Sequence, residues 1–147
     1  MKLFTACLMV ILFMAGCNKR GDKEAENKKI VTEALTEHLK NKFKDPDSVQ
    51  IRNPVLYTTQ FVFEDGVTRF NGQYGLCGEV NAKNSYGGYV GFRRFYSWLT
   101  VNPDGGIGDI SSSVDNSKDK DYFAQRIKDL FEQGYKEVCE NKEKPVK

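Results

Sequence analysis

Histidine, net charge and long apolar runs are all scarce in this 147-residue sequence, and each scarcity excludes a class of protein. There is one histidine, His38, so a histidine-rich metal site is excluded. Lysine and arginine (22) nearly balance aspartate and glutamate (20), so the basic excess of a dedicated nucleic-acid binder is missing. The apolar run 3–14 is well short of the roughly 20 residues that a membrane-spanning helix needs. We therefore expect no metal, no cofactor and no nucleic-acid partner.

The start of the chain has the organisation of a secretory leader, with an early positive charge followed by the apolar run 3–14. Two small residues then stand directly before Cys17, a boundary that resembles the lipobox of bacterial lipoproteins. The resemblance implies that residues 1–16 are a lipoprotein signal peptide and that Cys17 carries acyl chains such as palmitate. Because Asn18 follows rather than aspartate, it also implies the periplasmic face of the outer membrane. The alternative is an ordinary leader, in which Cys17 is a simple thiol.

The four cysteines can be sorted by position. Cys7 lies in the leader and Cys17 would be acylated, which leaves Cys77 and Cys139. An even pair in an oxidising compartment predicts one disulfide, worth roughly 4 kcal/mol on the chain-entropy model. The alternative is that both are free or functional thiols, but neither has a second cysteine or a histidine at ligand spacing.

Helical patterns stand on both sides of the middle of the chain. Residues 17–29, a lipidated cysteine followed by polar residues, predict a flexible tether. Apolar residues then recur every three or four positions over 30–43, which predicts a helix that ends before Pro46. A second stripe over 123–138 predicts a C-terminal helix capped by Ser117 or Asp119. It contains Gly134, and a helix-interior glycine costs about 1 kcal/mol against alanine, so close packing on the sheet is expected there.

Between the two stripes the pattern changes to that of β-strands. Short runs rich in β-branched and aromatic residues alternate with turns that contain glycine and asparagine. The runs are 49–53, 56–63, 67–70, 74–83, 89–101 and 107–110. They predict an α+β fold with an N-terminal helix, an antiparallel meander of four to five strands, and a C-terminal helix packed on the sheet and held by one disulfide. The domain is expected to cover residues 30–142, and 143–147 to form a tail.

The segment 77–95 contains the candidate functional residues. Strand alternation places Glu79 on the same face as Cys77, where a helix is expected to pack. Either a bulge near Gly78 changes the register, or this face carries a polar cluster in which an arginine of the next strand pairs with Glu79. Such a cluster could fix strand register or bind a ligand. Its candidate members are Glu79, Asn81, Lys83, Arg93 and Arg94.

A few other side chains are candidates for binding or catalysis. Tyr86, Tyr89 and Tyr96 are candidate binding aromatics. His38 borders an apolar stripe and is expected at the edge of the core rather than as a catalytic base. The three serines 111–113 are expected to form a turn, because the strand-to-helix motif that activates a serine nucleophile is missing.

One resemblance rests on three segments: Lys-Asp-Pro-Asp-Ser at 44–48, Ile-Arg-Asn at 51–53, and Cys-Gly-Glu-Val-Asn-Ala-Lys-Asn-Ser with a Gly-Gly-Tyr hairpin within 77–95. Together they resemble a family of small bacterial and prophage-encoded secreted proteins and lipoproteins. The family pattern has phenylalanine where Ile51 stands here. The resemblance implies the same small domain and brings no catalytic residues with it.

The sequence predicts a non-enzymatic, lipid-anchored periplasmic module that binds an envelope protein or polymer, for example in phage exclusion or in inhibition of an envelope hydrolase. One alternative is a small envelope hydrolase that uses a carboxylate such as Glu79, although no second carboxylate stands at a spacing that forces a pair. Another is a purely structural envelope lipoprotein. An exposed tyrosine patch would favour binding, and a cleft around Glu79 would favour an enzyme. The ligand and the oligomeric state do not follow from the sequence.

Overall fold

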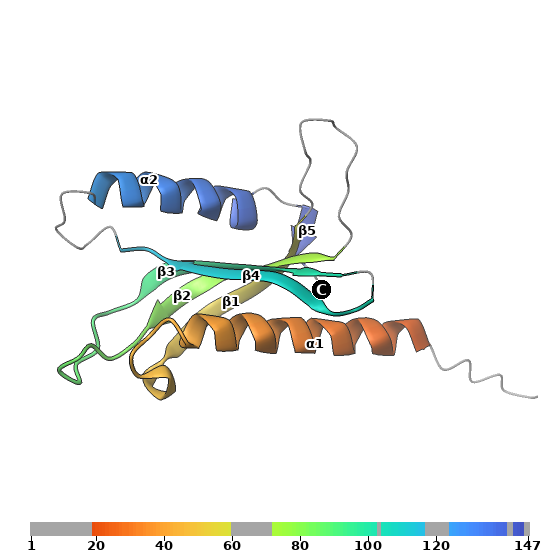
Figure 1. The fold of residues 1–147 in the computed structure, drawn as a ribbon, viewed down its shortest axis with the longest axis horizontal. Helices are drawn as coiled ribbons and strands as arrows, with labels where there is room; N and C mark the ends of the chain where they lie inside the picture. The colour runs from red at the N-terminus through yellow and green to blue at the C-terminus, as the bar shows by residue number, and fades with distance from the viewer. Residues whose placement is uncertain (1–18, 60–71, 103, 117–123, 141–142, 146–147) are drawn as a thin grey trace, which may run out of the picture.

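The computed structural model describes residues 19–59, 72–102, 104–116, 124–140 and 143–145, which form a five-stranded sheet between two helical layers (Figure 1). The helical elements are α1 (Lys19–Lys40), the 3-10 turn η1 (Pro46–Ser48), α2 (Ala124–Tyr135) and the π-helical turn η2 (Lys136–Glu140). The strands are β1 (Gln50–Thr59), β2 (Gln73–Asn81), β3 (Arg93–Val101), β4 (Ile107–Val114) and β5 (Glu143–Pro145).

The sheet is antiparallel throughout, in the order β4-β3-β2-β1-β5. Consecutive strands β1 to β4 are neighbours, so the predicted meander and the α+β class are confirmed. Residues 50–53 and 56–59 of the two predicted runs 49–53 and 56–63 are joined in one strand, β1, which continues through a register shift between Arg52 and Val55. Residues 60–63, the run 67–70 and the two cap candidates, Ser117 and Asp119, lie outside the described residues.

The main core lies between α1 and one face of the sheet. On the helix, Val31, Leu35 and Leu39 form the stripe that the sequence predicts, and all three are buried. They pack against four buried side chains of β2 and β3: Leu76, Val80, Phe95 and Leu99. Full burial of one such side chain is worth about 1.5–3 kcal/mol, so this stripe holds α1 on the sheet.

Two segments differ from the sequence prediction. The expected tether is helical from Lys19, since α1 extends well before Ile30. Lysine, glutamate and alanine are good helix formers, so this polar segment can continue the helix without any apolar face to bury. Residues 143–145 of the expected tail form β5, in which Pro145 pairs with Tyr57 at the edge of the sheet. Edge positions tolerate proline because its missing N–H is not needed there.

The second layer is fastened to the opposite face of the sheet by the predicted disulfide. Cys77 of β2 and Cys139 of η2 are bonded, with their Cα atoms 6.0 Å apart. The predicted close approach at Gly134 is also confirmed, because a Cβ atom at this position would collide with the ring and hydroxyl of Tyr96. Tyr96 also packs on Phe131 of α2, with ring centroids 5.4 Å apart. Helix and sheet therefore meet at a glycine that leaves space for a tyrosine.

Candidate functional site

Strand β2 directs apolar side chains toward α1, and both apolar and polar side chains toward α2. Val80 belongs to the α1 core, whereas Cys77 packs with Val138 and Cys139 of η2. Alternation along the strand therefore places Glu79 on the α2 face, as predicted. The pairing of β2 with β3 runs without a shift, and the bulge lies in β1, opposite Gly78. A bulge is thus present near Gly78, but it lies in the neighbouring strand and does not change the register of β2 with β3, so Glu79 stays on the disulfide face.

Glu79 pairs with Arg52 of β1, so the prediction of an Arg93 or Arg94 partner is wrong. Arg52 donates two hydrogen bonds, from Nε to Oε2 at 2.7 Å and from Nη2 to Oε1 at 3.0 Å. Its guanidinium lies over the ring of Phe92, 3.9 Å from the centroid. The hydrogen bonds from Arg52 lower the pKa of Glu79 below its ordinary value, which keeps the carboxylate charged.

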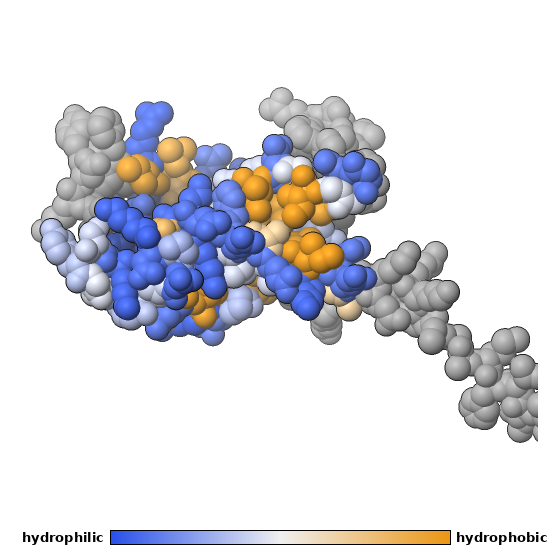
Figure 2. Space-filling view, turned by 60° about the horizontal axis from the view of Figure 1, so that its bottom comes forward, coloured by the Kyte–Doolittle hydropathy of each residue, from blue (hydrophilic) through white to orange (hydrophobic). Residues whose placement is uncertain are grey.

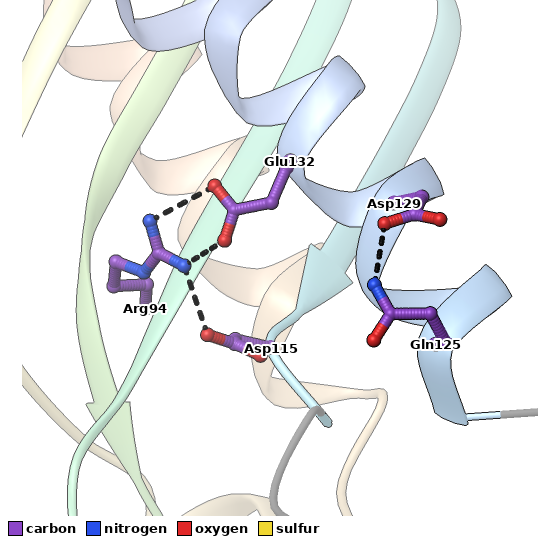
Figure 3. Close-up of polar contacts among 5 residues, drawn as sticks. All are labelled: Arg94, Asp115, Gln125, Asp129 and Glu132. Atoms are coloured by element: carbon purple, nitrogen blue, oxygen red, sulfur yellow. Dashed lines mark hydrogen bonds and ion pairs between the residues drawn. The ribbon is translucent and has the colours of Figure 1, made fainter.

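Arg94 stands directly opposite Glu79 in the register, but its side chain binds other carboxylates (Figure 3). It donates to Glu132 of α2 and, from Nη2 at 3.1 Å, to Asp115. Its guanidinium also lies 5.4 Å from the ring centroid of Phe131 and 5.0 Å from that of Tyr135. The hydrogen bonds to the two carboxylates raise the pKa of Arg94, and the whole set of contacts joins α2 to the end of the sheet.

The remaining members of the predicted polar cluster are distributed over both faces and the adjoining hairpin. Arg93 pairs with Val80 in the register, on the α1 face, and donates to Asn116 at 2.9 Å. Asn81 accepts a hydrogen bond from the backbone of Gly91 at 3.0 Å. Lys83 lies 5.8 Å from the ring centroid of Tyr89. The five residues therefore do not form one cluster.

The hairpin between β2 and β3 is held by hydrogen bonds inside its turn. Asn84 donates its backbone N–H to Gly88 and accepts that of Gly87, at 2.8 and 3.0 Å. Its side-chain oxygen accepts two further backbone N–H groups, from Tyr86 and Gly88. Gly87 has a φ of +80°, which favours glycine at this position. The turn therefore has a defined shape, although its residues are exposed.

The hairpin is also bound to the segment that follows α1. Ser48 accepts a hydrogen bond from the backbone N–H of Lys83 at 3.1 Å, and Lys44 donates to the hydroxyl of Ser85 at 2.9 Å. Ser48 is itself buried and donates to the carbonyl of Asp45. The Lys-Asp-Pro-Asp-Ser segment and the Gly-Gly-Tyr hairpin, far apart in the sequence, thus support one another.

Two of the three candidate tyrosines are at this hairpin and exposed. Tyr86 is 96% exposed and Tyr89 is 47% exposed. Tyr96 is different, because it packs against the disulfide-bonded Cys77 and Cys139 and against Phe131 of α2. It therefore contributes to the contact between α2 and the sheet. The expected patch of three tyrosines is therefore reduced to Tyr86 and Tyr89, with Tyr96 as a structural residue.

Residues of the hairpin and of α2 line an open cleft of about 710 Å³. These two elements lie at the same end of the molecule (Figure 1). The half-exposed side chains of Val90, Ile127 and Leu130 line the cleft. Four cations also line it: Lys42, Lys44, Lys83 and Arg93. Among its described lining residues there is no aspartate or glutamate. The cleft therefore combines apolar contact area with positive charge.

Figure 2 shows one face of the molecule, on which hydrophilic residues cover most of the left half and a small orange group lies at the upper left. The sequence does not predict this cleft. Its walls come from the segment after α1, the hairpin, the ends of β3 and β4, and α2. No local pattern signals that these segments meet.

Two further predictions concern the serines and the histidine. Residues 111–113 lie in β4, so the expected turn is wrong, and Ser112 is buried with its hydroxyl 2.7 Å from that of Ser97. The sequence pattern did not predict this strand because serine is a common turn residue. The hydroxyl of Ser112 can be buried because it is hydrogen-bonded to the hydroxyl of Ser97. His38 is partly buried on α1, next to the buried Leu39, as expected for a core-edge residue.

Within the described part of the chain, no helix is long and apolar enough to cross a membrane, and no three His, Cys, Asp or Glu side chains gather to hold a metal ion. No protein-family model, no curated protein and no solved structure matches this chain.

Proposed function

We propose that this protein is a non-enzymatic binding module, held in the bacterial cell envelope by acyl chains on Cys17, that contacts an envelope partner through the β2–β3 hairpin. The anchor rests on the leader and the residues before Cys17. The binding role rests on the hairpin and on the cleft beside it.

The observation that carries the proposal is the exposure of Tyr86 on an ordered turn. Tyr86 is 96% exposed, yet its backbone N–H is fixed by the side chain of Asn84 at 2.9 Å. An aromatic side chain presented on a fixed backbone loses little conformational entropy on binding, and tyrosine is enriched among the residues that dominate interface energies. Tyr89 and Val90 extend the apolar surface toward the cleft.

The geometry at Glu79 gives the alternative hydrolase little support. A general acid must hold a proton near neutral pH, whereas Arg52 lowers the pKa of Glu79 through two hydrogen bonds. Glu79 therefore acts as the partner of Arg52. The purely structural alternative does not account for a tyrosine that is almost wholly exposed on a hydrogen-bonded turn.

The experiment is photo-crosslinking in the intact envelope. A photoreactive amino acid is placed at Tyr86 and, as a control, at Glu33, an exposed position on α1. We expect a discrete crosslinked adduct from position 86 and none from position 33. No adduct at position 86, or the same adducts from both positions, would contradict the proposal.

A further inference from the structure

We propose that the partner presents an extended acidic segment with apolar side chains, which adds as a strand to the outer edge of β4 and places its side chains in the cleft. This inference rests on the proposed binding function and names the chemical class of the partner. Three observations carry it: the direction of the backbone groups of β4, the composition of its edge, and the lining of the cleft.

Strand β4 is the last strand on its side of the sheet, and among the described residues only β3 pairs with it. Asp115 donates its backbone N–H to the carbonyl of Arg94 at 2.9 Å, which marks this position as a hydrogen-bonded pair. Bonded and non-bonded pairs alternate along an antiparallel ladder. The backbone groups of Ile110, Ser112 and Val114 therefore point away from β3, toward the outer edge of the sheet, where no other described strand pairs with them.

Residues 111–114, the part of β4 nearest the cleft, lack several of the features that protect a sheet edge. Natural edge strands avoid unwanted pairing through lysines, prolines, bulges or very short length. Residues 111–114, Ser-Ser-Ser-Val, carry no charge and no proline, and their pairing with β3 has no register shift. An added strand could therefore pair with the outward groups of Ser112 and Val114.

The edge leads directly into the cleft, because Ser112 and Val114 line it. A strand added there would place alternate side chains about 7 Å apart on the same face. Apolar side chains could contact Leu130 and Val90, and carboxylates could reach the lysines of the rim, Lys44 and Lys83. Charge complementarity thus selects an acidic segment, and the backbone edge selects a peptide over a lipid headgroup, which has no strand to offer.

The test uses the full chain in detergent solution and a fluorescent peptide of alternating glutamate and valine that matches β4 in length. We expect saturable binding and slower amide hydrogen exchange at Ile110, Ser112 and Val114. The amides of Ser111 and Ser113 already face β3 and should not change. Failure of the peptide to bind, or binding without protection of the three outward amides, would overturn the inference.

Matched variants test the charge and the apolar wall. The double variant Lys44→Glu, Lys83→Glu should weaken binding about tenfold or more, because it reverses two charges beside the peptide. Lys136→Glu changes an exposed lysine outside the cleft and should leave the affinity within about twofold, since isolated exposed charges contribute little. Leu130→Ser should also weaken binding, and because Leu130 is 59% exposed the fold should tolerate it.

Two further probes test whether the cleft selects negative charge and whether it selects a peptide. A lysine–valine peptide should not bind, and binding equal to that of the glutamate peptide would refute charge selection. Dihexanoyl-phosphatidylglycerol should not protect the three outward amides, and equal protection would identify a lipid-binding site instead.

The peptide experiment and the crosslinking experiment can fail separately. If crosslinking at Tyr86 succeeds but the peptide does not bind, the proposed function stands and the acidic-strand inference fails. If the peptide binds but position 86 gives no envelope adduct, the hairpin contact fails instead.

Discussion

Arg52 and Glu79 form a two-point ion pair between β1 and β2, at 2.7 and 3.0 Å, immediately beside the bulge that interrupts the pairing of these strands. On the far side of the bulge, Val55 pairs with the disulfide-bonded Cys77. The ion pair and the disulfide-bonded residue thus lie on either side of the bulge, in which Asn53 and Pro54 of β1 stand opposite the single residue Gly78 of β2, so that β1 has one extra residue. The pair restores the register where the backbone ladder is disturbed.

The Arg52–Glu79 pair predicts a specific pH dependence of stability. The pKa of Glu79 is lower in the folded protein than in the unfolded chain, where it is near the ordinary value of about 4.3. Its contribution is therefore fully present above that value and is lost as the pH falls through the folded pKa. Glu79→Gln should lower the melting temperature at pH 7, and the difference should be smaller in acid, once the pH has fallen through the lowered pKa of Glu79 and the carboxylate has gained its proton. An equal difference at pH 7 and in acid would contradict a role for the charge.

Arg94 should be the more important arginine for stability, because it joins α2 to the sheet through Glu132, Asp115 and two aromatic rings. Arg94→Ala should cost about 1–3 kcal/mol in urea unfolding, a range discounted for the partial exposure of the side chain. Arg126→Ala is the control: it removes an exposed arginine of α2 and should change stability little. Equal effects of the two variants would show that the Arg94 network contributes nothing specific.

Gly134→Ala should destabilise the protein although alanine is the better helix former. The added Cβ atom collides with the ring of Tyr96, and overpacking of this kind costs about 1–3 kcal/mol. Gln133→Ala at the neighbouring exposed position should be neutral or slightly stabilising. Urea unfolding of the two variants measures the difference.

A double-mutant cycle separates the collision at Gly134 from any effect on the helix itself. Combining Gly134→Ala with Tyr96→Leu should cost less than the sum of the two single variants, because the smaller side chain removes the obstacle. Strict additivity would show that the two positions do not interact.

Because the disulfide joins Cys77 and Cys139, replacing either cysteine should cause the same loss of stability. Cys77→Ser and Cys139→Ser should each lower the free energy of unfolding by about 2–4 kcal/mol, and the double variant should be little worse than either, because all three lack the same bond. The denatured, unreduced protein should show no free thiol from this pair. Reaction of both cysteines with a thiol reagent before reduction would contradict the bridge.

Cys17→Ala tests the anchor. The variant should appear in the soluble fraction or accumulate as an unprocessed precursor, because stable membrane attachment needs more than one acyl chain. Fractionation of intact cells with an antibody to the protein measures this. A mature-sized variant that stays with the membranes would disprove the lipoprotein assignment.

The sequence by itself determines the features that depend on local spacing. The buried stripe of Val31, Leu35 and Leu39 follows from helical periodicity, and the strands follow from β-branched runs between turn residues. The disulfide follows from arithmetic, because only two cysteines remain when the predicted leader and the predicted lipidation site are set aside. Gly134 also predicts a close contact, because a glycine inside a helix lowers helix stability and is expected only where the packing leaves no space for a side chain.

Tertiary structure alone decides which of several possible partners a side chain meets. Glu79 has a neighbouring strand on each side, and the sequence does not show that Arg52 of β1 would bind it while Arg94 of β3 turns to Glu132 on α2. The position of Tyr96 in the strand pattern does not distinguish it from an exposed tyrosine. Only the packing of α2, which contacts its ring at Gly134, makes it a structural residue. The cleft is the extreme case, because segments far apart in the chain form its walls, and only the packed fold brings their charges and apolar side chains together.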